Sequence, residues 1–115
     1  MRFHHVGLEV TNLEKSMAFY QQLLNLEIET RFSFMNEDIV FLGSKDYRLE
    51  LIESQEDVRT VHICFEVPNL HEVMNQFHRT QKLEGPYELE NGWQTVFYEG
   101  PNREIIEFIQ IGNTL

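Results

Sequence analysis

The first half of the chain shows a hydrophobic pattern that changes from strand to helix and back to strand. Residues 3–10 alternate apolar and polar side chains and are rich in β-branched residues, which is typical of a strand with one covered face. Thr11 and Glu14 then have the spacing of a capping box. The apolar residues that follow share one helical face: Leu13, Met17, Tyr20 and Leu24. Three more strands are expected, near residues 26–34, 37–43 and 47–53.

The second half repeats this order of elements. A strand is expected at 60–67, and a helix from about Asn69 to Arg79 with its apolar residues on one face. Turn-forming pairs then separate the last strands: Gly85-Pro86, Asn91-Gly92 and Gly100-Pro101-Asn102. Each half therefore predicts the order βαβββ, and the whole chain an α+β fold with a curved mixed sheet.

The two halves are also similar in sequence. The segment HHVGLEVTNLEKSMAFY aligns with VHICFEVPNLHEVMNQF when the chain is shifted by 57 residues, and the same shift aligns RLELIE with IIEFIQ. One ungapped offset that holds at both ends of each half indicates an internal repeat. We expect a single domain over residues 1–115, with repeats 1–53 and 58–111 joined by the short polar segment from Ser54 to Arg59.

The alternation also predicts which side chains point away from the helices. In the first and last strand of each half, the apolar residues that alternate with polar ones should pack on the helix. This leaves two histidines and two glutamates on the opposite face, which is concave if the sheet curls: His5, Glu50, His62 and Glu107. Two imidazoles and two carboxylates suit one divalent Zn, Ni, Co, Fe or Mn ion. Ordinary solvated strand residues are the alternative.

Other residues near this face are candidates for substrate binding. Glu9 and Glu66 share it, and Arg48 is the one candidate to anchor an anion there. Trp93, Thr95 and Phe97 alternate along one strand and either line an apolar pocket or belong to the core.

The remaining His and Cys residues are given structural interpretations. Cys64 shares the face of His62, but a small buried hydrophobic residue is the simpler interpretation. His4 is expected on the helix side or at a sheet edge, and His71 and His78 on the solvated face of the second helix.

Composition limits the classes of partner and the compartment. The chain has 9 Lys+Arg against 19 Asp+Glu, a formal net charge of −10, which argues against a surface for nucleic acid or anionic membrane. One cysteine excludes an intrachain disulfide. No apolar run approaches the roughly 20 residues of a membrane span, and the N-terminus lacks the apolar core of a signal peptide. We therefore expect a soluble, cytoplasmic protein.

The repeated segments resemble the vicinal oxygen chelate superfamily. It includes glyoxalase I, bleomycin-binding proteins, extradiol dioxygenases, fosfomycin thiol transferases and methylmalonyl-CoA epimerases. The opening HHVGLEVTNLEKSMAFYQQLLNLE is similar to the first strand and helix of this superfamily, and the resemblance extends to about Ile111. Near the end, Gly100-Pro101-Asn102-Arg103 stands where members usually carry Asp-Pro-Asp-Gly, so Arg103 takes a position that suits positive φ.

The resemblance implies a metal site of the glyoxalase I type. Members of that group use His, Glu, His and Glu in chain order, which fall here on His5, Glu50, His62 and Glu107. Epimerases tend to carry Gln at the position of Glu50, and dioxygenases and thiol transferases keep two His and one Glu. The implied activity is a metal-dependent, lactoylglutathione lyase-like isomerisation of a 2-oxoaldehyde–thiol hemithioacetal through an enediolate, with Glu50 or Glu107 as the base. Glu9 stands where glutathione-using members carry Arg, which leaves another thiol or carbonyl substrate open.

The resemblance also implies an assembly, and it leaves two alternatives open. In glyoxalase I-like dimers the first module of one chain pairs with the second module of its neighbour, and the short segment between Glu50 and His62 favours such a homodimer. The alternatives are a non-catalytic binding protein for a small, cationic, antibiotic-type ligand, and a thiol transferase or dioxygenase of the same superfamily. Glu50→Gln separates them, because an isomerase needs Glu50 and an enzyme with two His and one Glu ligand tolerates the change.

Overall fold

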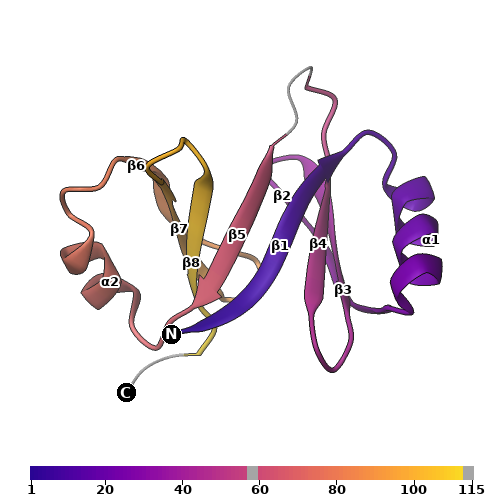
Figure 1. The fold of residues 1–115 in the computed structure, drawn as a ribbon, viewed down its shortest axis with the longest axis horizontal. Helices are drawn as coiled ribbons and strands as arrows, with labels where there is room; N and C mark the ends of the chain where they lie inside the picture. Colours follow the sequence, from indigo (N-terminus) through magenta and orange to yellow (C-terminus); the bar gives the residue numbers. More distant parts are fainter. Residues whose placement is uncertain (57–59, 113–115) are drawn as a thin grey trace. The chain divides into compact units, whose positions relative to one another are not determined.

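Two βαβββ modules follow one another along the chain (Figure 1). The computed structural model describes residues 1–56 and 60–112. The elements of the first module are β1 (Arg2–Val10), α1 (Leu13–Leu24), β2 (Glu27–Phe34), β3 (Glu37–Gly43) and β4 (Arg48–Glu53). Those of the second are β5 (Val61–Glu66), α2 (Leu70–Gln76), β6 (Lys82–Glu88), β7 (Gln94–Glu99) and β8 (Ile105–Gln110). The expected α+β class is confirmed. Residues 57–59 of the expected joining segment lie outside the described residues.

The strands are mixed in direction within each module. Hydrogen bonding orders the first four as β2-β3-β4-β1 and the second four as β5-β8-β7-β6. In each module the first and last strands, β1 with β4 and β5 with β8, run parallel. The other neighbouring pairs within the modules are antiparallel: β2 with β3, β3 with β4, β6 with β7 and β7 with β8. A parallel pair needs a long crossover, and the helix and two intervening strands supply it.

The chain divides into two compact units that differ slightly from the modules. One unit is residues 5–61, and the other combines Met1–His4 with the residues from His62 onward. Side chains attach the N-terminal residues to the second unit. Phe3 packs edge-on against Phe65 with ring centroids 6.0 Å apart, and Arg2 pairs with Glu66 at 3.1 Å.

Both helices begin with the same side-chain contacts. Asn12 accepts a hydrogen bond from the N–H of Lys15 at 3.0 Å, and Asn69 accepts one from the N–H of Glu72 at 3.1 Å. The expected capping box at Thr11 is therefore wrong, because the Asn12 amide oxygen satisfies an N–H of the first turn. A side chain from the last strand of each module accepts a hydrogen bond from another N–H of the first helical turn. Glu53 accepts from the N–H of Leu13 and Gln110 from that of Leu70, both at 2.8 Å.

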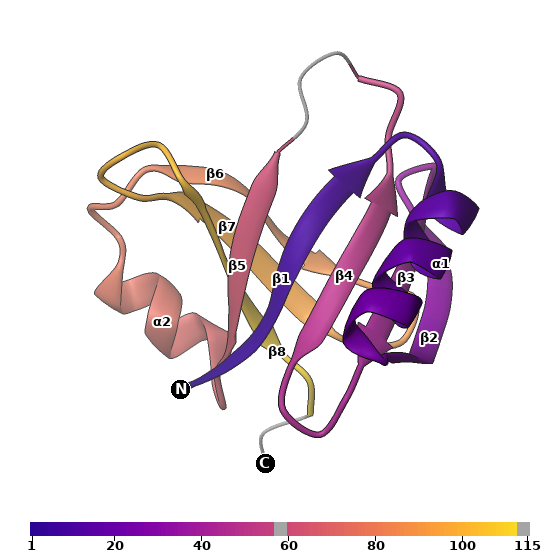
Figure 2. The ribbon, with the colours of Figure 1, turned by 45° about the vertical axis from the view of Figure 1, so that its right-hand side comes forward.

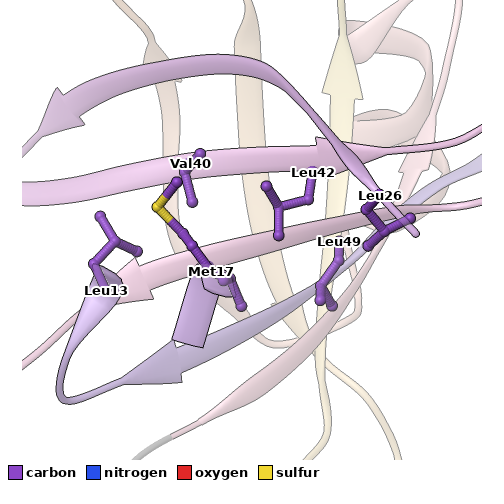
Figure 3. Packing of buried hydrophobic residues seen from close by; sticks show 7 residues of the cluster. Leu13, Met17, Leu26, Val40, Leu42 and Leu49 are labelled. Atoms are coloured by element: carbon purple, nitrogen blue, oxygen red, sulfur yellow. The ribbon is translucent and has the colours of Figure 1, made fainter. Parts of the chain in front are cut away.

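Each helix covers the apolar face of its own strands. Figure 2 shows α1 beside β3 and β4, and Figure 3 shows the side chains that fill the space between them. The buried residues of this first core are Leu13, Met17, Leu26, Val40, Leu42, Leu49 and Leu51. The second core, under α2, contains Val67, Leu70, Val73, Val96, Tyr98 and Phe108. Of the stripe expected on the first helix, Leu13 and Met17 are buried, and Tyr20 and Leu24 pack against the core while partly exposed.

One expected turn lies inside a strand. Gly85-Pro86 belongs to β6, where the pairing with β7 shifts register between Glu84 and Tyr87. β6 is the last strand in its module's hydrogen-bonding order, and a proline, which has no N–H to donate, is tolerated at such an edge or bulge. None of the helices among residues 1–56 and 60–112 is long and apolar enough to cross a membrane.

Candidate metal-ligating pairs

The first module holds a buried histidine–glutamate pair. His5 lies on β1 and Glu50 on the parallel strand β4, and His5 Nε2 is 3.1 Å from Glu50 Oε1. The imidazole is fully buried, and one-tenth of the glutamate side chain is exposed. Phe41 of β3 is directly opposite Glu50 and meets the His5 ring edge-on, with centroids 5.0 Å apart.

The second module repeats this arrangement. His62 of β5 and Glu107 of β8 place Nε2 and Oε1 3.1 Å apart, with 7% and 6% of the side chains exposed. Phe97 of β7 is opposite Glu107 and meets the His62 ring edge-on at 6.0 Å. Thr95 adds a contact by donating its hydroxyl hydrogen to Glu107 Oε2 at 2.5 Å. Each unit thus contains one pair of the same chemistry.

The alternation of each strand explains why these polar groups are not on the helix side. Residues directly opposite each other on neighbouring strands share a face of the sheet, so Glu50 shares the face of Phe41 and Glu107 that of Phe97. Their sequence neighbours Leu51 and Phe108 point to the other face and enter the two cores. The face expected for these four residues from the sequence is consistent with this packing.

The donor atoms of each pair suit a divalent cation. A neutral imidazole nitrogen and a carboxylate oxygen both present lone pairs, and at 3.1 Å they meet either through a shared proton or through a common cation. Burial of both partners makes an uncompensated charge there costly, so the pair favours a bound counter-charge. The imidazole and carboxylate combination is one that Zn, Ni, Co, Fe and Mn accept.

Comparison with known proteins places the chain in a family. The family model described as Glyoxalase/Bleomycin resistance protein/Dioxygenase superfamily matches residues 4–97. The chain belongs to this superfamily. This confirms the resemblance to the vicinal oxygen chelate proteins that the two repeated segments carry.

The chain is also similar to individual proteins along nearly its whole length. YwbC of Bacillus subtilis (strain 168) is 25% identical, with 95% of this chain and 97% of YwbC covered. The structure of BH1468 from Bacillus halodurans C-125 has a TM-score of 0.81 at 19% identity, covering 99% of this chain and 96% of that one. Methylmalonyl-CoA epimerase from Mycobacterium tuberculosis has a TM-score of 0.82 at 11% identity, covering 97% and 89%. At these identities the two structures show a shared fold.

The candidate substrate-binding residues of this superfamily member already have protein partners. Glu9 Oε1 accepts hydrogen bonds from the N–H and the hydroxyl of Thr60 at 2.6 and 2.8 Å. Glu66 accepts the Arg2 guanidinium at 3.1 Å. Arg48, the candidate anion anchor, donates to Glu29 of β2, with Nε to Oε1 at 2.5 Å. A substrate anion at Arg48 would therefore compete with a carboxylate already in place.

Both aromatic candidates, Phe97 and Trp93, contact a histidine ring. Phe97 stands against the His62 ring, whereas Trp93 meets the ring of the buried His4 edge-on at 5.5 Å. Neither belongs to the core under α2. His71 and His78 are exposed on and just after α2, as expected, and Cys64 is fully buried beside Glu107 in the strand pairing.

The first module has an acidic environment to which Glu37, not singled out from the sequence, contributes. Burial raises the pKa of Glu37, and the negative charge of Glu9 raises it further. A hydrogen bond with the Ser54 hydroxyl opposes this effect, whereas Glu56 and Glu50 add to it. A cation bound at Glu50 would relieve part of this repulsion.

Sequence analysis missed Phe41 and the contact of Thr95. The offset of 57 aligns the first and last strands of one module with those of the other. The strand pairing instead relates Phe41 to Phe97 and Ile39 to Thr95, which is an offset of 56. A search that allowed a one-residue gap would have aligned the two phenylalanines. Nothing in the sequence alone would have indicated that Thr95 contacts Glu107.

Proposed function

We propose that this protein is a metal-dependent, glyoxalase I-like lyase, which isomerises the hemithioacetal of a 2-oxoaldehyde and a thiol or a related small carbonyl compound. The proposal rests chiefly on one observation: a buried histidine–glutamate pair that occurs in both modules with the same 3.1 Å separation. Solvated strand residues, the simpler alternative, would not be buried in this way. His5, Glu50, His62 and Glu107 are the proposed ligands of one divalent ion.

The ligand types determine what the site contributes. A bound divalent ion supplies Lewis-acid polarisation of the substrate carbonyl oxygen and stabilises negative charge that develops on it. His5 and His62 offer an Nε2 lone pair to a cation only as neutral imidazoles. Phe41 and Phe97 stand edge-on to these rings and limit their rotation.

The reaction itself needs one carboxylate that moves a proton. In the proposed step a glutamate removes the carbon-bound proton of the hemithioacetal, and the electron pair of that bond forms the enediolate. The same carboxylic acid returns the proton to the neighbouring carbon, and the hydroxyl proton of the hemithioacetal passes to the other oxygen of the enediolate. The product is the 2-hydroxy thioester, with no net oxidation or reduction. Glu50 and Glu107 are the two candidates, since each combines a buried carboxylate with a histidine partner.

The likeness to methylmalonyl-CoA epimerase supports this chemistry in a general form. A structure of that enzyme in complex with methylmalonyl-CoA has a TM-score of 0.80 at 16% identity and covers 98% of this chain and 96% of that one. Epimerisation next to a thioester carbonyl also requires removal and return of a carbon-bound proton. A substrate screen should therefore include 2-substituted acyl thioesters beside 2-oxoaldehyde adducts.

We further propose that the protein acts as a homodimer in which the two copies share their sites. Analytical ultracentrifugation of the untagged protein tests this part. A monomer at micromolar concentration would contradict it.

Metal content is the first test of the function. Protein purified without an affinity tag or chelator is dialysed against mixed divalent ions and analysed by elemental mass spectrometry, beside His5→Ala and a control, His71→Ala, at an exposed position. We expect about one ion per chain in the wild type and the control and none in His5→Ala. Absence of metal under every loading condition contradicts the proposal and directs the search to a sequestered cationic ligand.

The second test is a screen with methylglyoxal and several thiols, using the metal-loaded protein. Glu50→Gln should abolish isomerisation, because both Glu ligands are needed in the proposed site. Full activity of Glu50→Gln, or transfer of a thiol without isomerisation, would indicate an enzyme that uses two His and one Glu.

A further inference from the structure

The two glutamates differ in a nearby residue of the neighbouring strand, two positions before the phenylalanine that lies directly opposite each of them. Thr95 of β7 is fully buried, and its hydroxyl lies 2.5 Å from Glu107 Oε2 and 3.1 Å from the carbonyl oxygen of Phe108. A hydroxyl has one hydrogen to donate, and the carboxylate is the stronger acceptor. The other oxygen of Glu107, Oε1, is the one 3.1 Å from His62 Nε2.

The first module has no hydroxyl at the corresponding position. In the second module Thr95 is paired with Ile109. The counterpart of Ile109 in the first module is Ile52, which is paired with Ile39. Ile39 is buried like Thr95, with 5% of its surface exposed, but it has no hydrogen to donate. The phenylalanines two residues further along, Phe41 and Phe97, are the same in both modules, whereas the residues at this position differ.

We propose that Thr95 is a positioning residue that orients the Glu107 carboxylate toward the metal. This inference rests on the proposed function, since it assigns Glu107 as a metal ligand. With Oε2 held by the hydroxyl, rotation of the carboxylate about its Cγ–Cδ bond breaks a charge-assisted hydrogen bond in a buried place. Oε1 is then kept on the side of His62 before any ion binds.

The cost of losing such an outer contact is known in general terms. Replacement of a hydrogen-bond partner behind a metal ligand weakens metal affinity by roughly 10–100-fold. Thr95→Val keeps the shape of the side chain and removes the hydroxyl, whereas Thr95→Ser keeps the hydroxyl and removes a methyl group. The two variants therefore separate hydrogen bonding from packing.

The experiment measures Zn²⁺ affinity of the full-length protein by competition with a chromogenic chelator. We expect Thr95→Val to raise the Kd by about 10–100-fold and Thr95→Ser to stay within about threefold of the wild type. Ile39→Val is the matched control, because it trims a buried side chain at the counterpart position without removing a hydroxyl. Its Kd should equal that of the wild type.

Each result has a distinct meaning. If Thr95→Val binds as tightly as the wild type, or if Thr95→Ser is the weaker of the two, the positioning role is wrong and the proposed metal site stands. If the wild type itself binds no Zn²⁺, the proposed function fails, and the role of Thr95 toward a metal fails with it. Circular dichroism spectra of each variant, compared before titration, show whether the fold is intact.

Discussion

A bound metal ion is expected to stabilise the fold by an amount that can be worked out in advance. A ligand present at 100 times its Kd adds about 2.7 kcal/mol to the free energy of unfolding when it binds only the native state. The unfolding entropy of globular proteins is about 2.1 cal/mol/K per residue, which gives about 0.24 kcal/mol/K for this chain. The expected rise in Tm on adding saturating Zn²⁺ is therefore about 11 °C.

The size of this shift in variants tests whether the two pairs act together. Because His5 and His62 are proposed ligands of one ion, His5→Ala and His62→Ala should each remove nearly all of the shift. Each variant also loses a buried side chain, so the metal-free Tm will fall as well. The quantity to compare is the difference in Tm with and without metal, measured by scanning calorimetry.

Two controls make the outcome decisive. His71→Ala removes an exposed imidazole and should keep the full shift. Isothermal titration should give one ion per chain. Two ions per chain, with each histidine variant retaining about half of the binding, would refute the shared site and show that each module binds its own ion.

Three further predictions concern stability without metal. Burial raises the pKa of Glu37 above 4.5, so the folded chain holds this proton more tightly than the unfolded chain, and stability falls as the pH rises from 4.5 through the raised pKa. Glu37→Gln should flatten this part of the pH profile in urea titrations with chelator present; an unchanged profile contradicts the assignment. Arg103 has a left-handed backbone with φ of 65°. Arg103→Gly should raise the free energy of unfolding by up to about 1 kcal/mol, because this conformation costs residues other than glycine roughly 1–2 kcal/mol, whereas glycine loses more entropy on folding. A lower Tm of Arg103→Gly would argue against strain there. Asn12→Ala should cost about 1 kcal/mol through loss of the cap to Lys15, and no cost in thermal unfolding would show that the cap is dispensable.

The sequence predicted the fold well because the information lies in local patterns and is present twice. The alternation of apolar residues placed β1 and β5 within one or two residues of their observed ends, and the helical stripe of Leu13 and Met17 is buried as expected. It misplaced the cap of α1 by one residue, since Thr11 and Asn12 are both good capping residues and only the observed hydrogen bond separates them.

The candidate pairs were predictable to a lesser degree. Alternation gives the face of a strand on which a residue lies, and this was enough to group the two histidines with the two glutamates. It does not give partners. Arg48 reaches Glu29 because those side chains project from β4 and β2, and Glu9 meets Thr60 across 51 residues of chain. Contacts of this kind depend on three-dimensional packing, which periodicity does not encode.

The internal repeat makes the two histidine–glutamate pairs alike, and the residues around them make them different. The repeated module supplies two like pairs of candidate ligands, but the proposed proton transfer needs one carboxylate to behave differently from the other. The chain introduces that difference in the residues around the pairs. Thr95 near Glu107 corresponds to Ile39 near Glu50. In the parallel strand pairing, Cys64 lies beside Glu107 and Gly7 beside Glu50. Both differences put a polarisable or hydrogen-bonding atom beside Glu107 and none beside Glu50 at the same positions. If the protein is an isomerase, substitutions that exchange these flanking residues between the modules should change which glutamate is essential, whereas a site that only sequesters a ligand should be indifferent to the exchange.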